Sequence, residues 1–223
     1  MGPNHRGHRR RVDRFEAAAE GLKSLLVLAI DSALDACSVA IARDGRTLAY
    51  ISEQMNRGQA ERLAPMVREA AVQAGVSFEQ IDRVAVTTGP GSFTGVRVGL
   101  SFARALALSL GKPCIGVSTL EALALAEGED GLRAALIETP GASYLALYED
   151  GAPLIAPRGI ERGEHEALLA IAAQGRPFNL SGPGVTPDVA ALAARTGRLD
   201  SARYPSDPTY LRAPHVTLPG GGA

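Results

Sequence analysis

The chain alternates between short apolar runs of strand length and longer stretches in which apolar residues recur every three or four positions. In the first half, the short runs predict strands over 25–30, 37–42, 47–51, 84–86 and 114–118. The stretches with helical spacing predict helices over 59–74, 92–110 and 119–126. Asp44-Gly45 falls between two predicted strands, and this dipeptide favours a two-residue hairpin turn.

The second half repeats this order of elements in a shorter form. Strands are predicted over 132–137, 144–148, 153–156 and 178–180, and helices over 164–173 and 187–195. Asp150-Gly151 predicts a second hairpin. The repeated order predicts an α/β protein of two tandem ribonuclease-H-like lobes with mixed sheets.

The polar segment 127–131 marks the expected boundary between the lobes. A first lobe over 24–126 then carries the longer helices, and a smaller second lobe with the tail covers 127–223. Residues 1–23 differ from both, because they hold five arginines within the first 14 positions and show no apolar periodicity. This composition predicts a disordered basic extension.

Pro65 affects where the helix over 59–74 begins. Proline lacks an N–H group and clashes with the preceding turn, so it is tolerated mainly in the first turn of a helix. We therefore expect the helix to begin near Glu61, with Glu61 and Arg62 solvated, and to end at Gly75.

The stretch from Val84 to Pro113 reads as a buried strand, a glycine loop and a long helix. Ser92 or Thr94 is expected to cap this helix, and Gly111 to end it. Apolar residues cover nearly its whole circumference, which is typical of a helix that is buried on all sides. A second protein could therefore cover its outer face.

A row of small residues runs along one side of the same helix. Gly95, Gly99, Ala103 and Ala107 are four positions apart, so they share one face. Another backbone can approach this face closely, because no long side chain stands on it. Two interpretations remain open from the pattern: the row contacts a partner protein, or it packs on the domain's own sheet.

The glycine loop matches neither common phosphate-binding motif. Thr94 stands where both the P-loop and the dinucleotide fingerprint need glycine, and no lysine follows Gly95. A helix N-terminus after a glycine loop can still hold an anion. The candidates for an anion or nucleotide contact are Asp31, Ser32, Gly91 and Ser92.

Asp31 ends the first predicted strand and is followed by a hairpin. Ribonuclease-H-like and actin-like ATPase domains begin in this way, and their aspartate usually faces metal or phosphate. Asp31 can instead cap the turn by accepting hydrogen bonds from the backbone of Ser32 and Ala33. The sequence places no second carboxylate beside it, which favours the turn cap.

Charge and cysteine content narrow the class of protein. The net charge of −1 and the pI near 6.4 give no general attraction to nucleic acid or acidic membranes. Cys37 and Cys114 form no spaced pair, which is typical of a reduced, intracellular protein without a metal site. No continuous run of 18 apolar residues occurs, so we expect no membrane span and a cytoplasmic location.

Four segments together resemble the TsaB family, which is also called YeaZ. They read LLVLAIDSALDACSVAI, ERLAPMV, AVTTGPGSFTGVRVGLSFARALALSLGKP with GVSTLEALA, and Tyr210-Leu211-Arg212. The match is close over residues 25–126 and looser beyond them. The pattern G-P-G-S-F-T-G-[LV]-R-[IV]-G is its most specific part.

The resemblance implies an actin-like ATPase fold and a non-catalytic role in the synthesis of threonylcarbamoyladenosine in tRNA. In the family, the related subunit TsaD carries the metal and the catalytic site, the small ATPase TsaE joins the pair, and tRNA is met through the complex. ATP and metal then belong to the partner subunits, and this chain holds no cofactor. A homodimer is expected when the chain is alone.

The resemblance also places the pairing surface on two helices that here are residues 61–74 and 95–110. On that basis the small-residue row is expected to face the partner. The predicted partner-binding residues are Leu63, Met66, Val67, Ala70, Gly95, Gly99, Leu100, Ala103, Leu106 and Ala107.

Enzyme hypotheses stand beside the subunit hypothesis. An ATP-binding or peptidase-like enzyme of the actin-like ATPase and glycoprotease superfamily needs further phosphate loops or an activated nucleophile. A ribonuclease-H-like nuclease needs several clustered carboxylates around two metal ions. The sequence supplies Asp31 alone at an expected position, so it favours an accessory subunit.

Overall fold

The computed structural model describes residues 24–211, and the predicted basic extension over 1–23 lies outside the described residues. The strands of the first sheet are β1 (Leu26–Asp31), β2 (Ala36–Arg43), β3 (Arg46–Gln54), β4 (Arg83–Thr87) and β5 (Cys114–Val117). They lie in the order β3-β2-β1-β4-β5. β1 pairs antiparallel with β2 and parallel with β4, so the sheet is mixed.

The second sheet has four strands in the order β8-β7-β6-β9. They are β6 (Leu132–Thr139), β7 (Ala142–Glu149), β8 (Ala152–Ile160) and β9 (Phe178–Ser181). β9 runs parallel to β6, whereas the other neighbours are antiparallel. Two mixed sheets confirm the predicted α/β class with two lobes.

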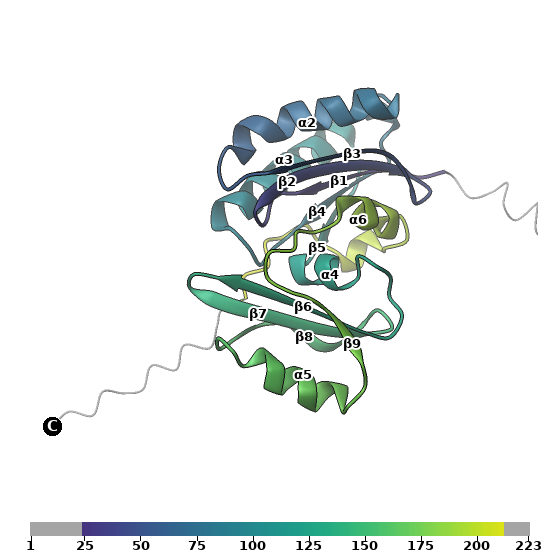
Figure 1. Ribbon diagram of the computed structural model, residues 1–223. Coiled ribbons are helices and arrows are strands. Elements are labelled where there is room, and N and C mark those ends of the chain that lie inside the picture. Colours follow the sequence, from purple (N-terminus) through teal and green to yellow (C-terminus); the bar gives the residue numbers. More distant parts are fainter. Residues whose placement is uncertain (1–23, 212–223) are drawn as a thin grey trace, which may run out of the picture.

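Helices form three layers around the two sheets. They are α2 (Gln59–Ala74), α3 (Phe93–Leu110), α4 (Thr119–Ala124), α5 (His165–Ala173) and α6 (Val189–Thr196), with 3-10 turns at Phe78–Gln80 and Ser201–Arg203. Figure 1 shows α2 and α3 on the outer face of the first sheet, α4 and α6 between the sheets, and α5 outside the second sheet. Each face of each sheet accordingly carries its own apolar cluster.

Each of the two helices between the sheets packs on the sheet of the other half of the chain. α4 precedes the expected boundary at 127, yet its Leu120 and Leu123 pack against β6 and β7. α6 follows the boundary, yet its Leu192 packs against the first sheet. Arg195 of α6 forms ion pairs with Glu121 of α4 and with Glu129. A single cut at residue 127 would therefore leave each sheet without the helix that covers its inner face.

The predicted turns and helix ends are confirmed by the backbone. Asp44 and Asp150 both adopt positive φ angles, 51° and 48°, and each is followed by a glycine with positive φ. This pair of conformations is the one that a two-residue hairpin turn requires. Gly75 ends α2 and Gly111 ends α3, both in the left-handed conformation that releases a helix.

The predicted start of α2 near Glu61 is wrong. The helix begins at Gln59, so Pro65 lies in its interior rather than in its first turn. Such a proline costs about 3 kcal/mol. Leu63 and Met66 flank it and are almost fully buried in the first core cluster, and this packing outweighs the local preference.

Candidate functional site

The residues predicted to contact an anion lie close together, but neighbouring backbone groups of the chain already contact three of them. Ser92 N–H donates to the carbonyl oxygen of Ala33 at 2.7 Å, and Ser32 Oγ donates to the carbonyl oxygen of Gly95 at 2.9 Å. A Cβ on Gly91 would lie 2.2 Å from the carbonyl oxygen of Ala33. The carbonyl groups of the turn after β1 thus fill the space in front of the N-terminus of α3. Their oxygens carry a partial negative charge and lie where an anion would bind.

The same contact settles which way the small-residue row faces. A Cβ on Gly95 would lie 2.0 Å from the carbonyl oxygen of Ser32, and a Cβ on Gly99 would lie 2.6 Å from Ser32 Oγ. Ala103 and Ala107 are buried in the same core cluster. The row therefore packs on the chain's own turn and sheet, and the prediction that it faces a partner is wrong.

The remaining predicted partner contacts are also covered by the first lobe itself. Leu63, Met66, Val67, Ala70 and Leu100 are at most 4% exposed. All ten predicted residues lie within the described range. Nine of them are buried, and Leu106 is half-buried. The residues chosen on these two helices therefore lie on the core side of each.

The outer sides of α2 and α3 carry a different set of residues, which we call the helix-pair face. It consists of Ala64, Arg68, Val72, Val98, Phe102, Ala105 and Leu106. Helical geometry places Val98, Phe102 and Leu106 on the side of α3 opposite Arg97 and Arg104. These three are partly buried against the first core cluster, whereas Val72 is 81% exposed. This face is apolar enough to be covered by another helix pair.

α3 is also the one helix within residues 24–211 whose length and composition would suffice to cross a membrane. In the fold it packs on β4, β1 and β5, and a third of it is buried. Its exposed side carries Arg97 and Arg104 at mid-helix. Its inner side thus packs on the first sheet as part of the first lobe.

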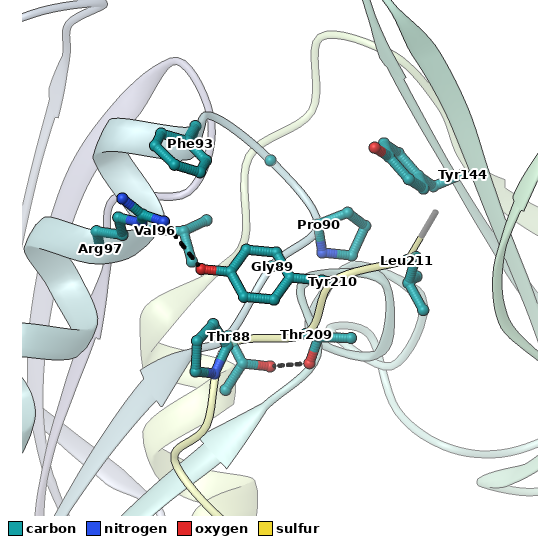
Figure 2. Close-up of a pocket in the computed structure, with 12 residues that line it drawn as sticks. Thr88, Gly89, Pro90, Phe93, Val96, Arg97, Tyr144, Thr209, Tyr210 and Leu211 are labelled. Carbon is teal, nitrogen blue, oxygen red and sulfur yellow. Dashed lines mark hydrogen bonds between the residues drawn. The ribbon is translucent and has the colours of Figure 1, made fainter. Parts of the chain in front are cut away.

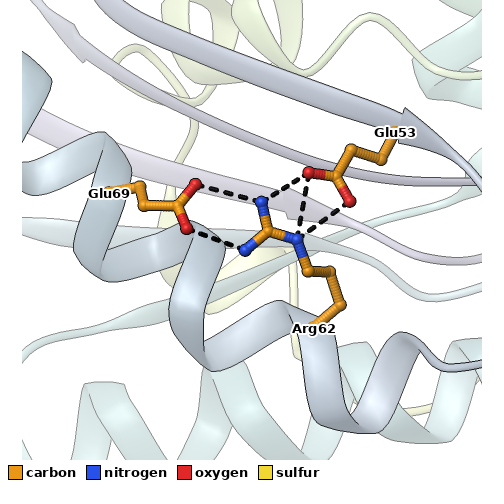
Figure 3. Close-up of polar contacts among 3 residues, drawn as sticks. All are labelled: Glu53, Arg62 and Glu69. Carbon is orange, nitrogen blue, oxygen red and sulfur yellow. Dashed lines mark hydrogen bonds and ion pairs between the residues drawn. The ribbon is translucent and has the colours of Figure 1, made fainter.

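Arg62 holds α2 against the edge of the first sheet, as Figure 3 shows. Its guanidinium donates to Glu53 of β3, with Nε 2.9 Å from Oε2, and to Glu69 about two turns further along α2, with Nη1 2.8 Å from Oε1. Hydrogen bonds from Arg62 lower the pKa of both carboxyl groups. Glu61 is exposed as predicted, whereas Arg62 is half-buried and paired with two carboxylates.

Asp31 is completely buried at the end of β1. Its Oδ1 accepts hydrogen bonds from Thr87 Oγ1 at 2.5 Å and from Ala33 N–H at 3.2 Å, so the predicted turn cap is confirmed. Its Oδ2 has no hydrogen-bond partner among the described residues. Burial raises the pKa of this carboxyl group to about 6, against the smaller lowering by Thr87 and Ala33.

No group of three His, Cys, Asp or Glu side chains within residues 24–211 converges as metal ligands would. A two-metal centre needs several such carboxylates in one place. The described residues therefore do not fit the metal site of a nuclease or of a metallopeptidase.

A cleft of about 480 Å³ lies beside the N-terminus of α3, between the two lobes. Figure 2 shows its lining: Phe93 and Arg97 from α3, Tyr144 from β7, Pro90 from the glycine loop, and Thr209, Tyr210 and Leu211 from the end of the described chain. The guanidinium of Arg97 stacks on Phe93, 3.6 Å from the ring centre. Arg97 Nη2 also donates to Tyr210 Oη at 3.4 Å.

The segment 204–211, which we call the strap, forms one wall of this cleft. Gly116 N–H donates to the carbonyl oxygen of Tyr204 at 3.0 Å, and Thr209 N–H donates to that of Thr88 at 2.8 Å. The strap thus covers β5, the edge strand of the first sheet. Sequence reasoning missed the cleft, although Tyr210 was part of the late matching motif, because its walls come from segments far apart in the chain.

The fold and these sites define a class of protein: a two-lobed α/β protein with one mixed sheet in each lobe. Two structures from Pseudomonas aeruginosa share the fold, one described as YeaZ and one as similar to peptidase YEAZ. They superpose with TM-scores of 0.66 and 0.67 at 26% and 27% identity. Each comparison covers 84% of this chain and all of the other.

Sequence comparison agrees with the structural one. The family model for TsaD, tRNA N6-adenosine threonylcarbamoyltransferase, matches residues 51–151. TsaB of Escherichia coli, a tRNA threonylcarbamoyladenosine biosynthesis protein, is 40% identical over 64% of this chain and 62% of its own. A protein of Mycobacterium tuberculosis described as uncharacterized is 32% identical over 84% of this chain and 92% of its own.

The chain is thus similar in sequence to TsaB proteins and in fold to YeaZ. It spans about half to three-fifths of the curated TsaB relatives that it matches, with 62%, 45% and 47% of their lengths covered in three of them.

Proposed function

We propose that this chain is a non-catalytic subunit in the synthesis of threonylcarbamoyladenosine in tRNA. Its partner is a TsaD-type threonylcarbamoyltransferase, which supplies the catalytic site and acts on the adenosine beside the anticodon. The names of the relatives support the pathway, since TsaB of Escherichia coli is a tRNA threonylcarbamoyladenosine biosynthesis protein. The match to the TsaD family model supports pairing between two related chains.

The helix-pair face carries this proposal. Val72 is 81% exposed on α2, and Val98, Phe102 and Leu106 are only partly buried on α3, which lies beside α2. Apolar side chains left uncovered on neighbouring helices favour a protein partner. A related chain would bring the same pair of helices, so four helices would pack into one bundle with a shared apolar core.

The rest of the proposed assembly follows from the same role. A TsaE-type ATPase joins the pair, tRNA is met through the complex, and ATP and metal are held by the partner subunits. Two copies of this chain pair through the helix-pair face when no partner is present. The complex works in the cytoplasm.

Ala105→Arg tests the pairing. Ala105 is exposed, so the variant folds normally, but the new charge would lie unpaired inside the proposed bundle. Burying an unpaired charge costs about 3 kcal/mol, and each 1.4 kcal/mol or so is tenfold in affinity. The dissociation constant for the TsaD-type partner, measured by calorimetry, should rise roughly a hundredfold.

Ile171→Arg is the matched control. Ile171 is 74% exposed on α5, at the opposite end of the molecule, so its replacement adds the same charge away from the proposed interface. Its affinity for the partner should equal that of the unaltered chain. If both variants weakened binding to the partner equally, or if neither weakened it, the proposed pairing surface would be contradicted.

The buried carboxyl group of Asp31 favours one alternative, an ATP-binding enzyme of the actin-like ATPase superfamily. Its free Oδ2 stands at the strand end where such enzymes face nucleotide or metal. Calorimetry of the isolated chain with ATP and magnesium decides between the two. Binding in the low micromolar range that Asp31→Asn abolishes would replace the subunit proposal by the enzyme.

A further inference from the structure

The cleft beside α3 has the size and the chemistry of a ligand site. Its volume of about 480 Å³ falls within the range of small-molecule sites, ~300–1,000 Å³. Three of its lining residues are aromatic: Phe93, Tyr144 and Tyr210. Phe93 and Tyr210 are 62% and 61% exposed, so they present ring surface that nothing in the described chain covers fully.

The charge of the lining selects the ligand further. Arg97 is the one charged residue among the described residues that line the cleft, and none of them is acidic. Its guanidinium is held in place by the ring of Phe93 and the hydroxyl of Tyr210, and it forms no ion pair within residues 24–211. A guanidinium has five N–H donors, so several remain free for an anion. The ligand therefore combines a planar ring with a negative charge.

We infer that this cleft binds one unstacked nucleotide of the tRNA, with the base against Tyr210 and Tyr144 and the phosphate on Arg97. Proteins hold single-stranded RNA by stacking its bases on aromatic and arginine side chains and by binding its backbone through cations. The inference rests on the proposed function, because that function places this chain in an assembly that binds tRNA.

The position of the cleft fits this role. The arginine side of α3, with Phe93 and Arg97, lies opposite the side that contributes Val98 and Phe102 to the helix-pair face. A partner can therefore cover the helix-pair face and leave the cleft open. Arg104 lies further along the same side of α3, where its bond to Asp207 of the strap is long, 3.5 Å, and it can add a second backbone contact.

The test uses the assembled complex of the full chain with its TsaD-type partner and measures tRNA binding at fixed salt. The double variant Phe93→Ala, Tyr210→Ala should weaken tRNA binding at least tenfold, because it removes one base-stacking ring, typically worth ~5- to 100-fold, and the ring that holds Arg97 in place. Arg97→Glu should weaken it further and reduce the salt dependence by about one phosphate contact. Both changes are at exposed side chains, so folding is retained.

Matched controls are available on the far edge of the first sheet. Tyr50→Ala removes an aromatic residue that is 48% exposed on β3, and Arg46→Glu reverses an exposed charge on the same strand. Neither should change tRNA affinity. Ultraviolet cross-linking of bound tRNA should label a peptide that contains Phe93 or Tyr210.

Three outcomes would overturn the inference. The first is unchanged tRNA affinity in the cleft variants, with a complex that size-exclusion chromatography shows to be intact. This result would leave the proposed function unaffected. The second is a wild-type chain that does not pair with the partner, which ends the proposed function and this inference together. The third is binding of free AMP or ATP, lost in the cleft variants, as tight as that of tRNA, which makes the cleft a mononucleotide site.

Discussion

Helix α3 has two sides without charged residues, and these sides differ in what they contact. The inner side carries Gly95 and Gly99, and the carbonyl and hydroxyl oxygens of Ser32 come so close that a Cβ would lie 2.0 to 2.6 Å from them. The outer side carries Val98, Phe102 and Ala105, which remain partly or fully exposed. The inner side is covered by the chain itself, whereas the outer side stays at least partly open to solvent.

This difference separates two kinds of sequence signal. A row of residues without side chains indicates that another backbone comes close, but it does not indicate whose backbone that is. Exposed apolar side chains on a helix whose inner side is already packed indicate a second protein more directly. The predictions below act on the junction of α3 with the turn after β1 and on the helices that carry the outer side.

Gly99→Leu should have the largest effect on stability. The added carbons would meet Ser32 Oγ and Val86, so the variant should lose about 3 kcal/mol of unfolding free energy, as over-packed cores do. The folded fraction should still bind the partner normally. Denaturant unfolding and partner affinity are measured on the same sample.

Ala105→Leu is the control on the other side of the same helix. Ala105 is exposed, so this change should alter the unfolding free energy by no more than about 0.5 kcal/mol. If Gly99→Leu left stability unchanged and weakened pairing instead, the inner side of α3 would have to be the partner surface.

Asp31→Asn should remove a pH dependence from the same junction. The pKa of Asp31 rises from 3.8 to about 6 on folding, so the folded chain holds the proton more tightly than the unfolded chain does. The stability that this proton provides is complete below pH 3.8 and is lost as the pH rises to about 6. Over that window it amounts to at most about 3 kcal/mol.

The measurement is the unfolding free energy of both chains between pH 4 and pH 7.5. The unaltered chain should lose stability across the window relative to the variant, whose amide does not titrate, and the two curves should run parallel above pH 7. An identical slope in both would show that Asp31 titrates normally and that its burial carries no electrostatic penalty.

Arg62→Met should have the smallest effect. Arg62, Glu53 and Glu69 are all partly open to solvent, and exposed ion pairs contribute little net stability. The melting midpoint should fall by only a few degrees, and the difference should shrink in high salt because mobile ions screen the pairs. A large loss that salt does not reduce would mean that Arg62 acts by packing α2 onto β3.

Much of the fold could be predicted from local pattern. The hairpins at Asp44-Gly45 and Asp150-Gly151 and the ends of α2 and α3 at Gly75 and Gly111 are confirmed, because glycine and aspartate accept backbone angles that other residues resist. The start of α2 was missed because Pro65 is tolerated where burial of Leu63 and Met66 outweighs its cost. The site was predicted less well, since nine of the ten chosen partner residues lie on the core side of their helices.

By itself, the sequence determined most elements of this protein, the ends of its two long helices, the two-lobe plan and the resemblance to TsaB. These depend on periodicity and on the conformational range of single residues, which act over a few positions. Only the tertiary structure decided that α4 and α6 exchange sheets, that the small-residue row meets Ser32, and that Phe93, Tyr144 and Tyr210 share one cleft. Periodicity tells which residues share a face, but the neighbour that covers the face comes from a distant part of the chain.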